Sequence, residues 1–190
     1  MDKKVIIGIG VVALILIVAG IFFFSDNSSN VISLKPSVYN GDVSNLVFSL
    51  EELPEGYSIA ERALRLESDV SDYAKSIGWK EGYYIRYLKG EGLSDISRIE
   101  IYLSRYPLEN ISKVLENQDD EIEGYTIESL PNPRIGDDSI AVRYTDNDFG
   151  LRDYSIEFYK KDIYVRIDNG GTATDYEMLK ELAQKLDSKI

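Results

Sequence analysis

Histidine and cysteine are both absent from this chain of 190 residues. Histidine is the commonest general base and zinc ligand, so Ser-His-Asp and Cys-His catalytic arrangements are excluded. Without cysteine, the chain has no disulfide framework and no lipid-modified cysteine anchor. Any catalysis would have to use Asp, Glu, Lys, Tyr, Ser or Thr. We identify no catalytic motif among these residues, and we expect a protein without enzymatic activity or a cofactor.

Basic residues are scarce relative to acidic ones. The chain has 21 Lys and Arg against 33 Asp and Glu, which gives a formal net charge of −12. A surface this acidic repels the phosphates of nucleic acids, so we expect no nucleic-acid partner. The simplest role of the excess negative charge is to keep the protein soluble.

Charged residues are also missing from residues 5–24, which form an unbroken apolar run of 20 residues. As a helix this run would span roughly 30 Å, the thickness of the hydrocarbon core of a bilayer. Lys3 and Lys4 precede the run, and the next basic residue is Lys35. The positive-inside rule therefore predicts a single-pass transmembrane helix in the cell membrane, with a cytoplasmic N-terminus and the rest of the chain extracytoplasmic.

Two alternatives to a permanent anchor remain open. A cleaved signal peptide has a shorter apolar core and a small-residue cleavage site, whereas this run ends in Ile21-Phe22-Phe23-Phe24. A pilin-like assembly segment would carry a small residue before its cleavage site and an early acidic residue. Here Lys4 directly precedes Val5 and no Glu lies in the run. We favour the anchor.

Composition divides the chain into three parts. Residues 1–24 are the cytoplasmic stub and the anchor. Ten of the 21 residues in 25–45 are Ser or Asn, so this segment is predicted to be a flexible tether. Residues 46–190 have the length of one ordinary domain and form the predicted extracytoplasmic unit.

Hydrophobic periodicity predicts an α+β domain. Helices are expected at residues 69–77, 107–118 and 174–190, where apolar positions recur every three or four residues. Alternating or β-rich segments are expected as strands at residues 57–66, 82–89, 99–103, 124–130, 140–144, 154–159 and 163–167. The sequence Asn169-Gly170-Gly171 is expected to be a turn. We therefore predict an antiparallel sheet of about six to seven strands with two to three helices packed on one face.

Several short motifs resemble those of extracytoplasmic domains of the PsbP-like kind. They are Leu53-Pro54-Glu55-Gly56-Tyr57, then Gly78-Trp79, Gly82-Tyr83-Tyr84, and Ile135-Gly136-Asp137-Asp138. A strand over residues 162–167 and a C-terminal helix complete the pattern. The resemblance implies a membrane-associated binding or assembly module, and it assigns no site residue.

Asp146, Asp148 and Glu157 occupy positions 1, 3 and 12 of a calcium-loop pattern. Calcium requires several converging carboxylate oxygens, and a bidentate Glu usually closes the loop. Positions 5 and 6 are Gly150 and Leu151, which do not fit the pattern. The three residues are metal candidates only, and a plain loop between two strands is the favoured interpretation.

The more polar face of the predicted sheet is rich in Tyr and Arg, which are enriched at binding hot spots. Cross-strand pairs that merely stabilise the sheet are the competing interpretation. The candidate binding residues are Tyr84, Arg86, Tyr102, Arg143, Tyr159, Tyr164 and Arg166.

Two sequons, at Asn27 and Asn110, are candidate glycosylation sites. Glu100 and Glu157 are a candidate carboxylate pair for an enzyme that cleaves glycans. We expect a non-catalytic, membrane-anchored module that binds a protein or another envelope component. The alternatives are a carboxylate-based extracytoplasmic enzyme and a pilin-like subunit.

Overall fold

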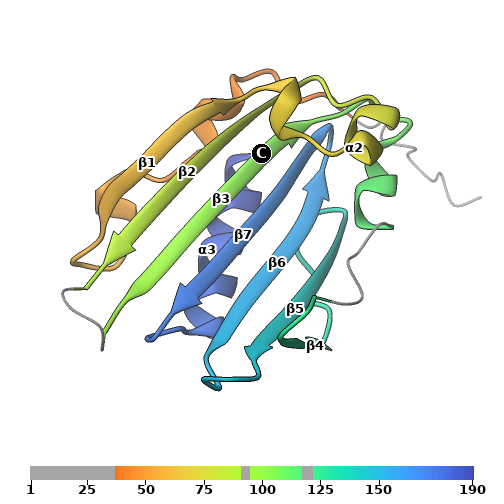
Figure 1. The fold of residues 1–190 in the computed structure, drawn as a ribbon. Helices are drawn as coiled ribbons and strands as arrows, with labels where there is room; N and C mark the ends of the chain where they lie inside the picture. The colour runs from red at the N-terminus through yellow and green to blue at the C-terminus, as the bar shows by residue number, and fades with distance from the viewer. Residues whose placement is uncertain (1–36, 91–94, 117–121) are drawn as a thin grey trace, which may run out of the picture. The chain divides into compact units, whose positions relative to one another are not determined.

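A single antiparallel sheet organises the domain (Figure 1). The computed structural model describes residues 37–90, 95–116 and 122–190. The seven strands lie in the order β1-β2-β3-β7-β6-β5-β4, so β3 and β7 join two meanders at the centre. The strands are β1 (Ser58–Arg65), β2 (Glu81–Lys89), β3 (Ser97–Arg105), β4 (Tyr125–Ser129), β5 (Asp138–Asp146), β6 (Arg152–Lys160) and β7 (Ile163–Gly171).

One long helix, α3 (Tyr176–Lys189), packs against one face of this sheet. Asp175 caps it by accepting hydrogen bonds from the backbone N–H groups of Glu177 and Met178. Its buried side chains recur at helical spacing and contact the sheet: Leu179, Leu182, Ala183 and Leu186. The remaining helical segments are short: η1 (Val43–Leu46), η2 (Leu50–Glu52), η3 (Glu67–Asp69), α2 (Asp72–Ser76) and η4 (Ile111–Leu115).

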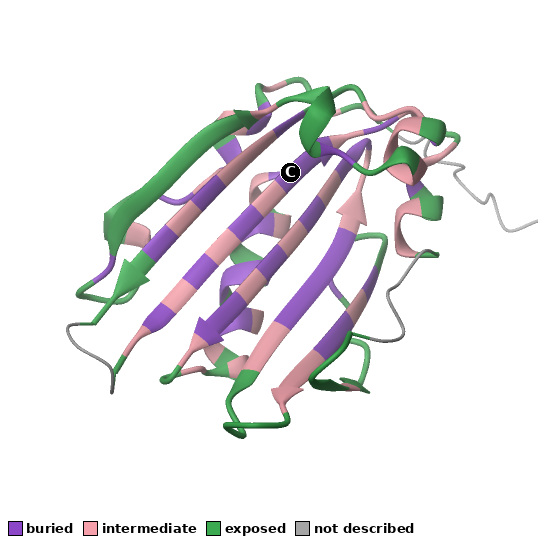
Figure 2. Cartoon of the chain, viewed as in Figure 1, coloured by how far each residue is buried: buried purple, intermediate pink, exposed green. Residues whose placement is uncertain are grey.

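The main core lies between the sheet and α3. Residues of β3 and β7 alternate between buried and partly exposed, which gives the banding of these strands in Figure 2. The side chains at the centre of this core are Ile99, Ile101, Leu103, Val165 and Ile167. Burying each such side chain contributes about 1.5–3 kcal/mol. The alternate residues of the same strands lie on the opposite face, which we call the open face.

A second, smaller core partly covers the open face. Ile77, Tyr106 and Ile111 form its centre, and Tyr159 and Tyr164 of the sheet pack against them. The segments that contribute these side chains include the region after α2 and the start of η4. Short helical segments therefore lie on the face opposite α3.

This arrangement corrects the predicted fold class, which placed two to three helices on one face. Only α3 is a long helix among the described residues. The helix predicted at residues 69–77 is reduced to η3 and the five residues of α2, and the one predicted at residues 107–118 is the 3-10 segment η4. Isolated helices this short do not repay their nucleation cost, so packing against the sheet determines their form.

The predicted transmembrane helix, residues 5–24, lies outside the described residues, as does most of the predicted tether. Within the ranges that the structure describes, we find no helix that is both long and apolar enough to span a bilayer. The folded domain begins earlier than residue 46. Val43 and Leu46 are both buried in the main core, so the tether prediction of residues 25–45 extends too far.

Candidate functional site

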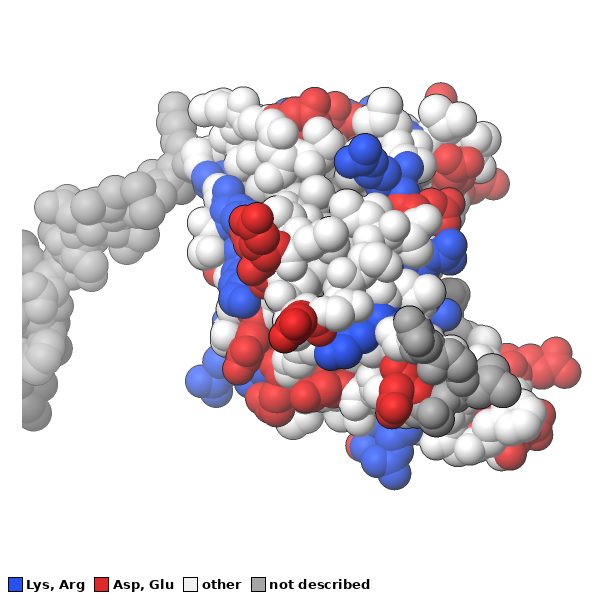
Figure 3. Space-filling view, turned by 90° about the vertical axis from the view of Figure 1, so that its left-hand side faces the viewer, with Lys and Arg blue, Asp and Glu red and all other residues white. Residues whose placement is uncertain are grey.

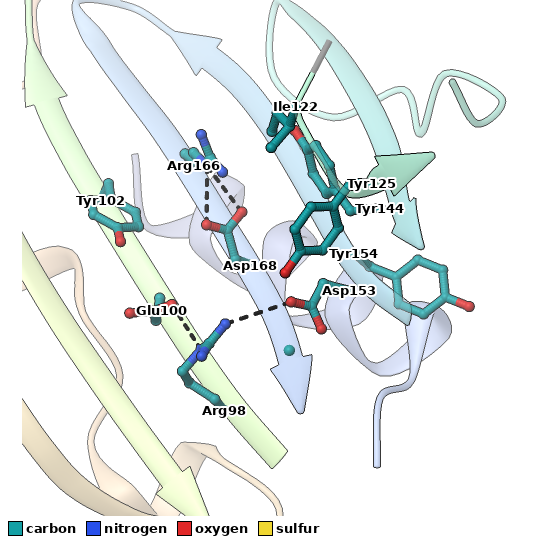
Figure 4. Close-up of a pocket in the computed structure, with 11 residues that line it drawn as sticks. Arg98, Glu100, Tyr102, Ile122, Tyr125, Tyr144, Asp153, Tyr154, Arg166 and Asp168 are labelled. Carbon is teal, nitrogen blue, oxygen red and sulfur yellow. Dashed lines mark hydrogen bonds and ion pairs between the residues drawn. The ribbon is translucent and has the colours of Figure 1, made fainter. Parts of the chain in front are cut away.

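The open face carries two adjoining hollows. The first has a volume of about 250 Å³ and lies over β3, β7 and β6 (Figure 4). Arg98, Glu100 and Tyr102 line it on one side, and Tyr125 and Tyr144 lie across from them. Ile122, Asp153, Tyr154, Arg166, Asp168 and Gly170 complete the lining.

The second hollow, of about 430 Å³, extends towards α2. It shares Tyr102, Tyr144 and Arg166 with the first, so the two hollows are continuous along the sheet. Tyr73 and Ala74 of α2 bound it on the other side. The short helix α2 therefore forms one wall of this site.

Arg166 is the central charge of both hollows. Its Nε donates to both carboxylate oxygens of Asp168 at 3.0 Å, and its Nη1 lies 3.9 Å from Glu157 Oε1. Its guanidinium also lies 6.0 Å from the centre of the Tyr102 ring. Burial opposes the charge on Arg166, but the attraction of Asp168 and Glu157 outweighs it and raises the pKa of the guanidinium.

A second ion-pair chain crosses the first hollow. Arg98 Nε lies 2.9 Å from Glu100 Oε2, and Arg98 Nη2 lies 3.7 Å from Asp153 Oδ2. The hydroxyl of Tyr84 donates to Glu100 Oε1 at 2.6 Å. Burial, together with this hydrogen bond to the carboxylate, raises the pKa of Tyr84. Both acidic residues of this ion-pair network, Glu100 and Asp153, therefore have a basic or hydroxyl partner.

Burial raises the pKa of two further groups of the site, Tyr164 and Asp168. Tyr164 donates its hydroxyl to Glu157 Oε2 at 2.6 Å, and burial and the negative charge of Glu157 raise its pKa. Burial also raises the pKa of Asp168, although Arg166 opposes the shift. The site is thus a network of paired charges and tyrosines. Such a network presents hydroxyl, guanidinium and carboxylate groups that can bind a polar ligand.

Six of the seven predicted binding residues lie on the open face. Across β2 and β3, Tyr84 lies opposite Tyr102 and Arg86 lies opposite Glu100, and the centroids of the Tyr84 and Tyr102 rings lie 4.8 Å apart. Glu157 and Tyr159 of β6 lie opposite Arg166 and Tyr164 of β7. Tyr102, Tyr164 and Arg166 line the hollows, whereas Tyr84, Arg86 and Tyr159 do not line either one.

Arg143 is placed differently from the prediction. It pairs in register with Tyr154, which packs against Tyr176 of α3, so Arg143 faces the α3 side of the sheet. There it forms an ion pair with Glu128 of β4. On β5, Ile140, Val142 and Tyr144 instead share the open face, opposite Glu157, Ser155 and Asp153.

The sequence interpretation missed most of the lining of the first hollow, including its polar residues Tyr125, Tyr144, Asp153 and Asp168. The alternation of β7 could have identified Asp168, because residues 164, 166 and 168 share one face. Asp153 follows in the same way from β6. Tyr125 could not be found by periodicity, since it lies at the start of the short strand β4.

The three calcium candidates do not converge. Asp146 Oδ1 accepts from the backbone N–H groups of Asp148 and Phe149, which closes the turn after β5. Glu157 pairs with Ile140, six residues from Asp146 along β5, so it lies roughly 20 Å away. No group of three or more acidic residues that could hold a metal ion occurs within residues 37–90, 95–116 and 122–190.

Glu100 of β3 and Glu157 of β6 lie two strand spacings apart, with β7 between them. They are also offset by two residues along the strands, so their Cα atoms are roughly 12 Å apart. Both are held by tyrosine hydroxyls and have an Arg neighbour. Asn110 lies directly before η4, and its Oδ1 accepts from Lys113 at 3.0 Å. Asn27 lies outside the described residues.

Comparison with known proteins adds a likeness of fold. No protein-family model matches the chain, and no curated protein does, so the PsbP-like resemblance has no support from sequence. The structure is similar to the crystal structure of the extracellular domain of PknH from Mycobacterium tuberculosis, with a TM-score of 0.58. The match has 8% identity and covers 77% of this chain and 93% of that one. At this identity the likeness concerns the fold alone.

Proposed function

We propose that the chain is a membrane-anchored, extracytoplasmic binding module that holds a polar ligand in the two hollows without catalysing a reaction. The observation that carries the proposal is the continuous pair of hollows around Arg166 and Tyr102. The charged side chains that line it are already fixed by ion pairs, so little ordering entropy opposes binding. The structural neighbour is described as an extracellular domain, which supports the proposed location.

The charge balance of the first hollow favours a neutral polar ligand. Glu100, Asp153 and Asp168 face Arg98 and Arg166, so the lining carries one net negative charge on a chain of −12. All three carboxylates are already paired with Arg98 or Arg166, so little unpaired charge remains to hold a strongly charged ligand. Tyrosine rings beside guanidinium and carboxylate groups suit a ligand rich in hydroxyl groups. An envelope glycan or a polar protein segment therefore fits best.

The anchor follows from the apolar run at residues 5–24 and the two lysines before it. In intact cells, added protease should remove the domain while the N-terminal stub stays protected. Full protection of the domain would overturn the proposed orientation. Processing close to Lys4, together with filament formation, would instead support a pilin-like subunit.

Binding can be tested with two matched variants. Tyr125 is 40% exposed and lines the first hollow, whereas Phe149 is 79% exposed and does not line either hollow. Neither substitution removes a core side chain, so both variants should fold. Soluble glycan and protein fractions of the envelope are titrated separately against the full chain. We expect Tyr125→Ala to weaken binding about fivefold or more and Phe149→Ala to leave it unchanged.

Two results of this titration would overturn the proposal. One is an equal effect of the two substitutions, because the ligand would then not occupy the first hollow. The other is the appearance of cleaved glycan products, because the module would then be catalytic. Binding to a neutral ligand should also change little with salt, in contrast to steering by surface charge.

A further inference from the structure

Strand β1 is an edge strand that leaves one side of the sheet unpaired. It bonds to β2 only, and among the described residues no other strand lies beside it. Seven of its eight residues are exposed, and the eighth is partly exposed. Figure 3, which views this side of the molecule, shows a broad uncharged area bordered by acidic and basic groups. A row of backbone donors and acceptors is thus available for pairing with another strand.

Part of the protection usual for an edge strand is present here. Natural edges carry bulges, prolines, charged side chains or short strands that discourage pairing, and β1 carries three charges, Glu61, Arg62 and Arg65, but no proline. In β1 the register shift lies between Ile59 and Glu61, near the start of the strand, and residues 61–65 continue without interruption. Large apolar side chains are exposed along it, with Leu64 at 68% and Leu66 at 63%. An exposed edge of this kind is a template for strand addition.

We propose that a second copy of this chain occupies the edge, with the two β1 strands antiparallel about a two-fold axis at Ala63. In this register Glu61 lies opposite Arg65 of the second copy, and Arg65 lies opposite its Glu61. Both residues belong to the open face, because Glu61 is paired in register with Arg86 and Arg65 donates to Ser104. Within the single chain Glu61 already forms an ion pair with Arg86 at 2.7 Å and Arg65 donates to Ser104, so the dimer adds a second unlike charge opposite each of them.

Charge excludes the neighbouring registers. An axis at Glu61 places two Glu61 side chains opposite each other, and an axis at Arg62 does the same with two Arg62 side chains. An axis at Leu64 sets Glu61 against Glu67. Like charges directly opposite destabilise a strand pair. Among these registers, only the axis at Ala63 places unlike charges opposite each other.

On the other face, the axis at Ala63 sets Leu64 opposite Arg62 of the second copy and Leu66 opposite Ala60, and the two Leu64 side chains are diagonal neighbours. The small side chain at the axis lets the strands approach without a clash. Pairing would bury the apolar side chains that the single chain exposes. It would also place the hollows of both copies on the same side of a continuous sheet.

Disulfide trapping tests this register directly, because the chain has no cysteine of its own. Directly opposite residues in an antiparallel pair have Cα atoms about 4.5–5.5 Å apart, within the range that a disulfide requires. The full chain carrying Ala63→Cys is oxidised in detergent micelles at low protein concentration. Ser58→Cys on the same strand and Ser129→Cys on the opposite edge strand β4 are the controls.

We expect a covalent dimer with Ala63→Cys and about tenfold less with either control. The two Ser58 positions would be roughly 34 Å apart in this dimer, too far for a disulfide. In the Ala63→Cys background, Glu61→Arg or Arg65→Glu should each lower dimer formation, and the double exchange should restore it. Leu64→Lys should lower it without changing the circular dichroism spectrum of the domain.

Three results would overturn the proposal. They are the absence of trapping at residue 63, equal trapping at all three cysteine positions, and a double exchange that lowers the yield of covalent dimer as much as the two single exchanges added together. An introduced thiol at residue 63 that resists maleimide in the unoxidised chain, even at dilutions where the chain is monomeric, would show that another segment of the same chain covers the edge. That result would also exclude the second copy as the occupant.

Discussion

Asn169 offers the sharpest test of how the sheet and α3 are joined. Its side chain is fully buried. Nδ2 donates to Ser97 Oγ and to the carbonyl oxygen of Arg98, both at 3.0 Å, and Oδ1 accepts from the Asp175 backbone N–H at 2.7 Å. Ser97 is in turn hydrogen-bonded to Tyr57 at 2.6 Å. One amide therefore connects β3, β7 and the start of α3.

The cost of Asn169→Ala follows from these contacts. Three hydrogen bonds are lost, each contributing about 1 kcal/mol net, and a buried group left without a partner costs about 1–3 kcal/mol. Ser97 keeps its bond to Tyr57, which limits the loss. We expect a decrease of about 3–5 kcal/mol in the free energy of unfolding, a large fraction of the 5–15 kcal/mol typical of a domain.

Urea unfolding followed by the fluorescence of Trp79, the single Trp, measures this loss. The midpoint should fall with an unchanged slope. Asn45→Ala is the matched control, because Asn45 is exposed. It should change stability by less than about 0.5 kcal/mol. A loss below about 1 kcal/mol for Asn169→Ala would refute the proposed network.

The isosteric change Asn169→Asp adds a test by pH. The introduced carboxylate can still accept from Asp175, but it cannot donate to Ser97 or Arg98 until it is protonated. Its folded-state pKa should therefore be raised by burial and by the lost donor. The destabilisation should be largest at neutral pH and should decrease as the pH falls through that raised value. A pH-independent difference from the parent chain would contradict this account.

Three further changes test the framework around the site. Gly136→Ala should cost at least about 1–3 kcal/mol, because Gly136 has φ +68° and an added Cβ would meet Tyr159 O, which thermal unfolding would detect. Tyr87→Phe should cost about 1–3 kcal/mol in urea unfolding, because the fully buried hydroxyl donates to Phe48 O at 2.6 Å. Burial raises the pKa of Asp168 above 3.8, so the folded parent chain loses stability as the pH rises from about 3.8 through the raised pKa. Asp168→Asn has no group to titrate there, so its stability relative to the parent should increase between these two pH values and level off above them. Urea titrations at successive pH values would test this.

Alternation predicts strands well where one face meets a packed core. The sequence alternates over residues 97–103 of β3 and 163–167 of β7, because α3 covers one face and the other face stays partly wet. The same logic fails in β5, where Ala141 and Val142 are both buried although they lie on opposite faces. Val142 faces the open side, so the apolar set of this strand does not mark the main core. Arg143 was assigned to the wrong face for this reason.

Turn chemistry misled the prediction at Asn169-Gly170-Gly171. These residues favour turns locally, but here they continue β7 and pair with Ser97, Arg98 and Ile99 of β3. The glycines fit because a Cβ at Gly170 would meet Arg98 Nη2 and one at Gly171 would meet Ile96 O. Tertiary packing therefore overrides the local preference, as it does for the short helices.

The hollows depend on strand order, which local sequence does not determine. The first hollow combines residues from β3, β7 and β6 with Tyr125 of β4. Strand β3 contributes to it only because β3 pairs with β7. Periodicity can place Arg98 and Arg166 on some wet face, but it cannot place Asp153 next to Arg98. That pairing sets the charges of the first hollow, because Arg98 lies between Glu100 of its own strand and Asp153 of β6. The same alternating pattern with another strand order would bring other charges together, so the lining of the hollow rests on the β3–β7 junction.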